Sequence, residues 1–145
     1  MIIGSQAGEI YLVFGKSGGY AAGLEISSLD GSNGFRISAI DESDFLGWSA
    51  SSAGDVNGDG IDDLIIGADW GDPYGNNNAG ESYIVFGTDQ GYPAQFELST
   101  LDGSNGLTLN GSRDMDISDI SGVVVAGAGD FNGDGIDDVT VGALG

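Results

Sequence analysis

Short apolar runs, each closed by a glycine or a polar turn, are the main pattern along this chain. The runs are rich in β-branched and aromatic residues and comprise residues 11–14, 35–37, 64–66, 83–86, 107–109 and 139–141. Most are apolar on both faces of an extended chain, which predicts central strands covered on both sides. The small-residue segments 48–53 and 123–128 predict two further strands. No window shows sustained helical periodicity, so the pattern predicts an all-β protein.

The predicted elements recur along the chain. The recurring phrases are LDGSNG at 29–34 and 101–106, VFG at 13–15 and 85–87, and an acidic nonapeptide at 55–63 and 130–138. Residues 1–5 resemble the phrase that follows each nonapeptide. Because internal repeats define the architecture, we divide the chain into a partial repeat at 1–46, a complete repeat at 47–121 and the start of a third at 122–145.

Each repeat offers about four short antiparallel strands, with the acidic nonapeptide as the loop between the first and second strands. A four-stranded unit that is apolar on both faces needs a neighbour stacked on each face, which is the arrangement of β-propeller blades. We therefore predict antiparallel four-stranded blades, about two repeats of a larger ring. Two units cannot close a ring, so we expect exposed strand edges that pair with neighbouring blades of a longer chain or cause self-association.

Both nonapeptides carry oxygen-bearing side chains at alternate positions. Positions one, three, five and nine supply side chains, and position seven supplies a backbone carbonyl with its side chain turned into the core. The candidate ligands are Asp55, Asn57, Asp59, Ile61 and Asp63 in the first loop, and Asp130, Asn132, Asp134, Ile136 and Asp138 in the second. An all-oxygen set on a tight loop suits Ca²⁺ better than Mg²⁺. We expect about two calcium ions, one per loop.

The loops have two other interpretations. An EF-hand or dockerin-type loop needs a carboxylate at position twelve, where this chain has Ile66 and Val141. The alternative without metal is a pair of solvated Asn/Asp-Gly turns, which the repetition of the full ligand set disfavours. Asp62 and Asp137, at position eight, are interpreted as surface residues.

The charge balance is strongly acidic, with 23 Asp and Glu against 3 Lys and Arg and a net charge of −20. Self-repulsion destabilises a compact state of this size, and bound cations would relieve it. Nucleic acids and anionic membrane surfaces are excluded as partners. The absence of His and Cys removes the commonest nucleophiles, general bases and zinc ligands, so we expect no catalysis within this chain. No apolar run is long enough to insert into a membrane, and the first residues show no signal peptide.

Three features together resemble a known repeat family. Leu46-Gly47 before the first strand, the acidic loop at 55–63 and the phrase IIGA at 65–68 look like an FG-GAP repeat, as in the β-propellers of integrin α-subunits and of large secreted bacterial proteins. The resemblance implies four-stranded blades, calcium in the loop between the first and second strands, and recognition of a protein or carbohydrate on a propeller face. The sequence departs from the family pattern at Ser121-Gly122, where Phe-Gly is usual. The long connections at 16–33 and 88–105 resemble the bacterial extracellular versions.

The function predicted from these features is adhesion or recognition within a larger secreted or cell-surface protein of bacterial type. The alternatives are a calcium-rigidified spacer and a non-catalytic accessory segment of a secreted enzyme. Trp70 and Tyr74 flank Pro73 in a polar loop and are the candidate ligand-binding residues, although such aromatic residues also anchor long loops. Because antiparallel strands alternate in direction, we expect these aromatics at the end of the blade opposite the acidic loop, and the connection after VFG at the same end as that loop.

Overall fold

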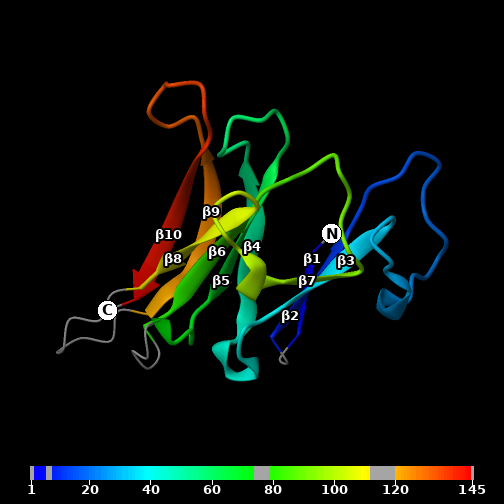
Figure 1. Ribbon diagram of the computed structural model, residues 1–145, viewed down its shortest axis with the longest axis horizontal. Helices are drawn as coiled ribbons and strands as arrows, with labels where there is room; N and C mark the ends of the chain where they lie inside the picture. Colours follow the sequence, from blue (N-terminus) through cyan, green and yellow to red (C-terminus); the bar gives the residue numbers. More distant parts are fainter. Residues whose placement is uncertain (1, 6–7, 74–78, 112–119, 145) are drawn as a thin grey trace.

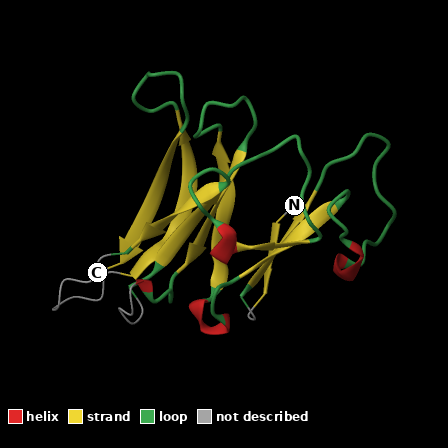
Figure 2. Cartoon of the chain, in the orientation of Figure 1, coloured by secondary structure: helices red, strands yellow, loops and turns green. Residues whose placement is uncertain are grey.

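The protein is described from a computed structural model that covers residues 2–5, 8–73, 79–111 and 120–144. The strands are β1 (Ile2–Ser5), β2 (Glu9–Val13), β3 (Gly34–Ser38), β4 (Leu46–Gly54), β5 (Asp63–Ala68), β6 (Glu81–Val85), β7 (Gln95–Glu97), β8 (Gly106–Asn110), β9 (Ile120–Gly129) and β10 (Asp138–Leu144). The described helices are single 3₁₀ turns, η1 (Ile26–Ser28), η2 (Glu42–Asp44) and η4 (Leu98–Thr100). The fold is all-β, as the sequence predicts (Figure 2).

The strands form three sheets that lie side by side, with the second between the first and the third (Figure 1). The middle sheet has the order β4-β5-β6-β8 and is antiparallel throughout. Its order and direction match the four-stranded blade predicted for the complete repeat. Among the described strands, the third sheet contains only β9 and β10, in the order of the first two strands of such a blade.

The first sheet reaches four strands in a way that the repeat pattern did not predict. Its order is β1-β2-β3-β7, and β7 pairs with β3 in parallel although it belongs to the following repeat. The chain therefore leaves β6, crosses to the outer edge of the neighbouring sheet, and returns to its own sheet as β8 (Figure 1). A parallel pairing needs a long connection between its two strands, and the chain between β3 and β7 includes β4, β5 and β6.

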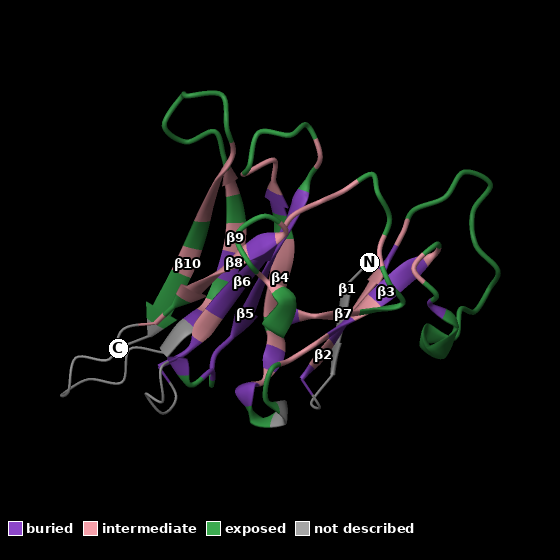
Figure 3. Cartoon of the chain, viewed as in Figure 1, coloured by how far each residue is buried: buried purple, intermediate pink, exposed green. Residues whose placement is uncertain are grey.

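Two apolar layers hold the sheets together, one on each face of the middle sheet. The first layer joins the first and middle sheets, and its fully buried members include Ile10, Phe35, Ile37, Leu46, Ile66, Ala68 and Tyr83. The second layer joins the middle and third sheets through Ala53, Ile65, Ile84 and Val125. Successive residues of β5 enter opposite layers, because side chains alternate across a strand. The burial map shows the resulting continuous buried band along β5 and β6 (Figure 3).

The contact between the middle and third sheets requires glycine at position 67. A Cβ atom placed there would meet the carbonyl group of Gly122 and lie 2.7 Å from the Ser49 hydroxyl oxygen. That hydroxyl donates a hydrogen bond to the same carbonyl at 3.1 Å. The backbones of β5 and β9 therefore approach each other closely where a polar bond crosses between the sheets.

Gly67→Ala should destabilise the fold by about 1–3 kcal/mol, the usual cost of overpacking a close contact. The matched control is Gly142→Ala at the corresponding position of β10, where the added Cβ would lie 3.4 Å from Val124, an ordinary contact. Neither glycine has a positive φ, so backbone strain affects neither variant. Urea denaturation of the two variants measures the difference, and equal stabilities would contradict the close-packing argument.

Candidate metal centre

Both acidic loops lie at one end of the sheets, the first between β4 and β5 and the second between β9 and β10 (Figure 1). All ten candidate ligands fall within the described residues. The structure thus brings each predicted set together on one short loop, and places the two loops on adjacent sheets.

The carboxylate at position one organises the backbone of each loop. Asp55 Oδ1 accepts hydrogen bonds from the amides of Gly58 at 2.8 Å and Asp59 at 3.0 Å, and its Oδ2 accepts from Gly60 at 2.8 Å. Asp130 accepts the same three bonds in the second loop, at 2.7, 2.9 and 2.9 Å. Because these three hydrogen bonds recur in both loops, the nonapeptide sequence adopts the same local backbone conformation in each.

The side chains at positions three and five fold back on the loop in the same way. Asn57 Oδ1 accepts a hydrogen bond from the Asp59 amide at 2.8 Å, and Asp59 Oδ1 accepts from the Ile61 amide at 2.9 Å. The corresponding bonds in the second loop are 2.9 and 3.0 Å. Asp59 and Asn57 are exposed, so their remaining oxygen lone pairs are open to solvent or to a cation.

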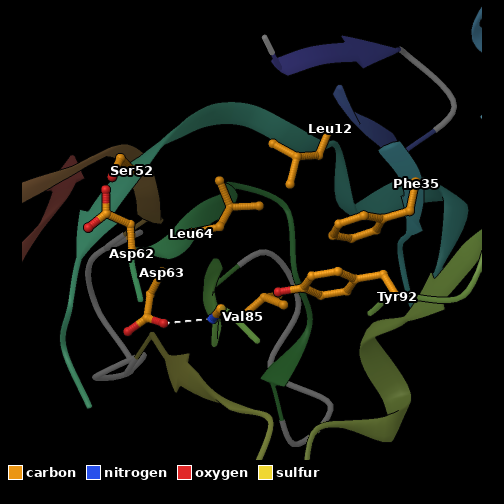
Figure 4. Close-up of a pocket in the computed structure, with 9 residues that line it drawn as sticks. Leu12, Phe35, Ser52, Asp62, Asp63, Leu64, Val85 and Tyr92 are labelled. Carbon is orange, nitrogen blue, oxygen red and sulfur yellow. Dashed lines mark hydrogen bonds between the residues drawn. The ribbon is translucent and has the colours of Figure 1, made fainter. Parts of the chain in front are cut away.

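Position nine ties the first loop to the rest of the blade. Asp63 is only 4% exposed and lies beside an apolar pocket wall that includes Leu64 and Val85 (Figure 4). Its Oδ1 accepts a hydrogen bond from the Gly87 amide at 2.7 Å, and its Oδ2 accepts from Val56 at 2.9 Å. The first of these bonds fixes the connection after VFG at the same end as the acidic loop, which confirms that prediction.

Burial raises the pKa of the Asp63 carboxyl above its usual value. The hydrogen bonds from the Gly87 and Val56 amides oppose this effect on the pKa, and the charges of Asp59 and Asp55 add to it. The three carboxylates are therefore close enough to repel one another. A bound cation would remove that repulsion.

The donor chemistry of the loops fits calcium, because every candidate ligand offers a hard oxygen. In the described ranges, however, no group of three or more Asp, Glu, His or Cys side chains is already gathered around one point as a metal shell. Asp59 Oδ2 instead accepts a hydrogen bond from the Asn57 amide nitrogen at 2.9 Å. Since both of these side chains are exposed, rotation about their side-chain bonds would turn oxygens toward an ion while the backbone of the loop stays in place.

Two interpretations of individual loop residues were wrong. Asp137 is not a plain surface residue: its Oδ2 accepts a hydrogen bond from the Asp55 amide at 3.0 Å, and its own amide donates to the Asp55 carbonyl at 3.1 Å. The Ile136 side chain does not turn into the core, since it is 42% exposed and would lie 3.6 Å from a Cβ at Gly58. Both residues contact the first acidic loop. The pattern within a single repeat does not reveal such a contact between repeats.

The opposite end of the sheets carries Trp70, as predicted. Trp70 is 48% exposed, its ring centroid lies 5.0 Å from that of Phe45, and its amide donates to the Asp44 carbonyl at 3.3 Å. Trp70 is therefore anchored on one side and open on the other. Tyr74, the second candidate ligand-binding residue, lies outside the described residues.

Asp44 is a buried acid at this end of the sheets. It is 4% exposed, its Oδ2 accepts a bond from the Asp41 amide at 3.3 Å, and its Oδ1 has no partner among the described residues. Burial, and then the charges of Asp41, Glu81 and Asp72, raise its pKa to about 6 against the hydrogen bond from Asp41. The acidic pair Asp41 and Asp44, which forms a capping box around η2, was the sequence feature that could have drawn attention to Asp44.

Residues 47–85, from the start of the middle sheet through β6, match the FG-GAP repeat. The chain belongs to the FG-GAP repeat family. The matched segment contains the whole first acidic loop and the strands on either side of it.

Segments of a phospholipase and of integrin alpha chains are similar to this chain. The chain is 38% identical over 98 residues to phosphatidylinositol-glycan-specific phospholipase D of Bos taurus and 34% identical over 100 residues to integrin alpha-2 of Mus musculus, covering 68% and 69% of this chain. It is 28% identical over 145 residues to integrin alpha-PS2 of Drosophila melanogaster, covering 97% of this chain. The matched stretches make up 11%, 8% and 10% of the lengths of those three relatives, so the chain spans only a small part of each.

The described part of this FG-GAP chain contains no helix with the length and apolar character that a membrane span requires.

Asp44→Asn should change how stability depends on pH. Because the folded-state pKa of Asp44, about 6, lies above its ordinary 3.8, the folded wild type binds a proton more tightly, and its stability falls as pH rises through this interval. Raising the pH from about 5 to about 7.5 should cost the wild type about 1.4 kcal/mol relative to the variant. Urea denaturation at both pH values measures this, with the exposed Asp89→Asn as control. A parallel pH dependence of Asp44→Asn and wild type would show that Asp44 is not titrating in this range.

Proposed function

We propose that this chain is a calcium-binding β-propeller module of a larger secreted or cell-surface protein, and that it acts in adhesion or recognition. The observation that carries the proposal is the pair of acidic loops on adjacent sheets with the same internal hydrogen bonds. Similarity to integrin alpha segments supports the adhesive role.

Each loop would hold one calcium ion through the side chains at positions one, three, five and nine and the carbonyl at position seven. In the first loop these are Asp55, Asn57, Asp59, Asp63 and the Ile61 carbonyl; in the second they are Asp130, Asn132, Asp134, Asp138 and the Ile136 carbonyl. The ion supplies positive charge at the point where three carboxylates crowd one turn. Affinities of about 10⁻⁴ to 10⁻³ M are typical of extracellular modules, which favours a location outside the cytosol.

The two loops would also act on each other, because Asp137 of the second loop binds the backbone at position one of the first. Its two hydrogen bonds with Asp55 fix the residue that accepts the other amides of the first loop. A calcium ion that orders one loop therefore stabilises the geometry of the next.

Recognition would occur at the end that carries Trp70, remote from calcium. An exposed indole ring held by Phe45 presents a flat apolar surface to a protein or a carbohydrate. The spacer alternative assigns Trp70 only an anchoring role. Binding of wild type but not Trp70→Ala to a glycan or protein array, in saturating calcium, would favour recognition.

The bovine phospholipase D supports the other alternative, a non-catalytic accessory segment of an enzyme. Its matched segment is 11% of that protein, so the similarity concerns one small part of a larger chain. The adhesion module and the accessory segment would share the same calcium-binding propeller architecture and would differ in the rest of the protein.

Calorimetric titration should detect about two calcium ions per chain at millimolar metal. Asp59→Ala should remove one site and leave the second loop working, and Asp134→Ala should do the converse. Chelation should lower the melting temperature of the wild type, because an ion that binds only the folded state stabilises it. Absence of any calcium heat, with a melting temperature indifferent to chelator, would show that the loops are plain turns.

Asp137→Ala should weaken calcium binding at the first loop although Asp137 belongs to the second. We expect a several-fold lower affinity at the first site, because the Asp55 amide loses its acceptor. Asp62→Ala is the matched control, since Asp62 holds the same loop position and is exposed. Measuring both variants in the Asp134→Ala background isolates the first site. Unchanged affinity in Asp137→Ala would contradict the coupling.

A further inference from the structure

Two connections of the chain meet at the end of the sheets that carries Trp70 (Figure 1). One runs from β3 to β4 and contains η2, and the other runs from β5 to β6. The Trp70 amide donates to the Asp44 carbonyl at 3.3 Å, which joins the two connections. In the middle sheet Leu46 of β4 lies opposite Ala68 of β5, and Ala68 lies opposite Glu81 of β6. The residues just outside these pairs are therefore neighbours in space.

Four acidic residues from both connections lie in this region. They are Asp41 and Asp44 before β4, Asp72 after β5, and Glu81 at the start of β6, and we call them the inter-sheet acid cluster. Asp44 is buried and Glu81 is partly buried, whereas Asp41 and Asp72 are exposed. The connection that carries Asp44 links the first sheet to the middle sheet, so both sheets that position the cluster belong to the described chain.

The acidic side chains lie around the hydroxyl end of Tyr83. That hydroxyl donates a hydrogen bond to Glu81 Oε2, and Tyr83 is 1% exposed. Burial and the contact with Glu81 raise the pKa of the Tyr83 hydroxyl, and the charges of Asp44 and Asp41 add to this effect. The charges of Asp41, Glu81 and Asp72 act in turn on Asp44. Negative charges from both connections therefore meet at one buried place.

One carboxylate oxygen of this cluster is buried without a hydrogen-bond donor. Asp44 Oδ2 accepts from the Asp41 amide at 3.3 Å, but Oδ1 has no partner among the described residues. Asp63 is equally buried, and both of its oxygens accept backbone amides. A buried carboxylate oxygen that lacks a donor costs stability, which a bound cation would recover. Asp44 therefore offers the cluster a buried oxygen that is available to a ligand.

The first sheet contains the same tyrosine–glutamate pair, in the preceding repeat. The Tyr11 hydroxyl donates to Glu9 Oε2, and the Arg36 guanidinium donates to Glu9 Oε1 at 2.9 Å. Arg36 lies opposite Tyr11 on the adjacent strand β3. In this sheet the glutamate therefore receives one hydrogen bond from the tyrosine and one positive charge.

The middle sheet lacks that positive charge. Thr108 of β8 lies opposite Tyr83, in the place that Arg36 has in the first sheet. The other described cation, Lys16, lies over a tyrosine ring with its ammonium nitrogen 5.4 Å from the ring centre. Arg113 is outside the described residues. The inter-sheet acid cluster therefore has more carboxylates than the pair in the first sheet and no cation from the described chain.

We propose that the inter-sheet acid cluster binds a hydrated divalent cation of the Mg²⁺ class, with Asp44 and Glu81 as its direct ligands. Asp41 and Asp72 accept hydrogen bonds from water molecules in the shell of the ion. The ion supplies the positive charge that Arg36 supplies in the first sheet. This site lies at the opposite end of the sheets from the acidic loops and does not depend on whether those loops bind calcium.

Mg²⁺ fits these residues better than Ca²⁺. In the described ranges no three acidic side chains are gathered around one point. Asp44 is buried and Glu81 is bonded to Tyr83, so these side chains do not rotate freely as exposed loop residues do. Mg²⁺ keeps several waters and commonly uses one or two carboxylates, whereas Ca²⁺ takes about six to eight oxygen ligands. Two direct carboxylates with a shell of water therefore match Mg²⁺.

An ion at this position would link the two connections. Asp44 belongs to the connection between the sheets, and Glu81 follows the connection within the middle sheet. A shared ion therefore stabilises the packing of the first sheet on the middle sheet. It also holds Trp70, whose backbone lies between the two ligands.

Calorimetric titration with Mg²⁺, in enough Ca²⁺ to fill the acidic loops, tests the site. The wild type should bind about one Mg²⁺ per chain, and added Mg²⁺ should raise its melting temperature. Asp44→Asn and Glu81→Gln should each weaken Mg²⁺ binding at least about tenfold, because each removes one direct carboxylate. Asp89→Asn removes an exposed acid near the other end of the sheets and should bind Mg²⁺ like the wild type.

Thr108→Arg gives the middle sheet the arginine of the first sheet. Its guanidinium should bind Glu81 as Arg36 binds Glu9, so the variant should melt at a higher temperature without metal and lose most of its response to Mg²⁺. Thr108→Gln adds length without charge and should keep the wild-type response. Because Thr108 is not a ligand, this pair separates the need for positive charge from the loss of a ligand.

Mn²⁺, used as a paramagnetic substitute for Mg²⁺ under the same conditions, locates the ion. It should broaden the amide NMR signals of Asp44, Trp70 and Glu81 before those of Gly58 and Gly133 in the acidic loops. Thermal melts in chelator check that every variant folds.

Mg²⁺ binding that both ligand variants weaken and that Thr108→Arg replaces would support the proposal. A wild type whose melting temperature and calorimetric heat do not respond to Mg²⁺ would overturn it. Binding unaffected by Asp44→Asn and Glu81→Gln, or Mn²⁺ broadening confined to the acidic loops, would do the same. Mg²⁺ binding that appears only in Arg113→Gln would show that the chain itself supplies the cation, and would also overturn the proposal.

Discussion

The structure depends on sheets that are apolar on both faces and so must be stacked. β5 is buried along its whole length, with Ile66 in one layer and Ile65 in the other. Burial of such side chains contributes about 1.5–3 kcal/mol each, and it is available only when a sheet stands on each side. The close approach at Gly67 and the crossing of β7 both follow from this requirement, because each brings a neighbouring sheet nearer to the middle one.

The strong negative charge acts against this packing, and the structure confines much of it to turns at the ends of the sheets. In the acidic loops the carboxylates accept backbone amides, so each charge is partly compensated by local dipoles. The exceptions are the buried acids Asp63 and Asp44, whose pKa values are raised by burial. One lies at the acidic-loop end and the other beside Trp70, so the two ends of the blade differ in what a cation or a ligand would meet.

Contacts between repeats use residues that look equivalent in sequence but not in environment. Asp137 binds Asp55 across two loops, while Asp62 at the same loop position is exposed. Tyr92 stacks on Phe35, while Tyr20 is exposed. Each difference has the same cause: Asp137 and Tyr92 contact a neighbouring repeat within the described residues. Equivalent sequence positions therefore differ in the surface that they meet.

The sequence by itself determined the local features, namely the strands, their order within the middle sheet, and the conformation of loops such as 55–63. These depend on neighbours close along the chain: strand alternation, glycine turns, and carboxylates that accept amides a few residues away. The calcium ligands predicted from that spacing stay a prediction. Only the tertiary structure decided that β7 joins the preceding sheet, that Asp137 binds the neighbouring loop, and that Asp44 is buried. Those outcomes depend on which surfaces of neighbouring repeats come into contact. A phrase that recurs in the sequence does not show which neighbour each copy contacts.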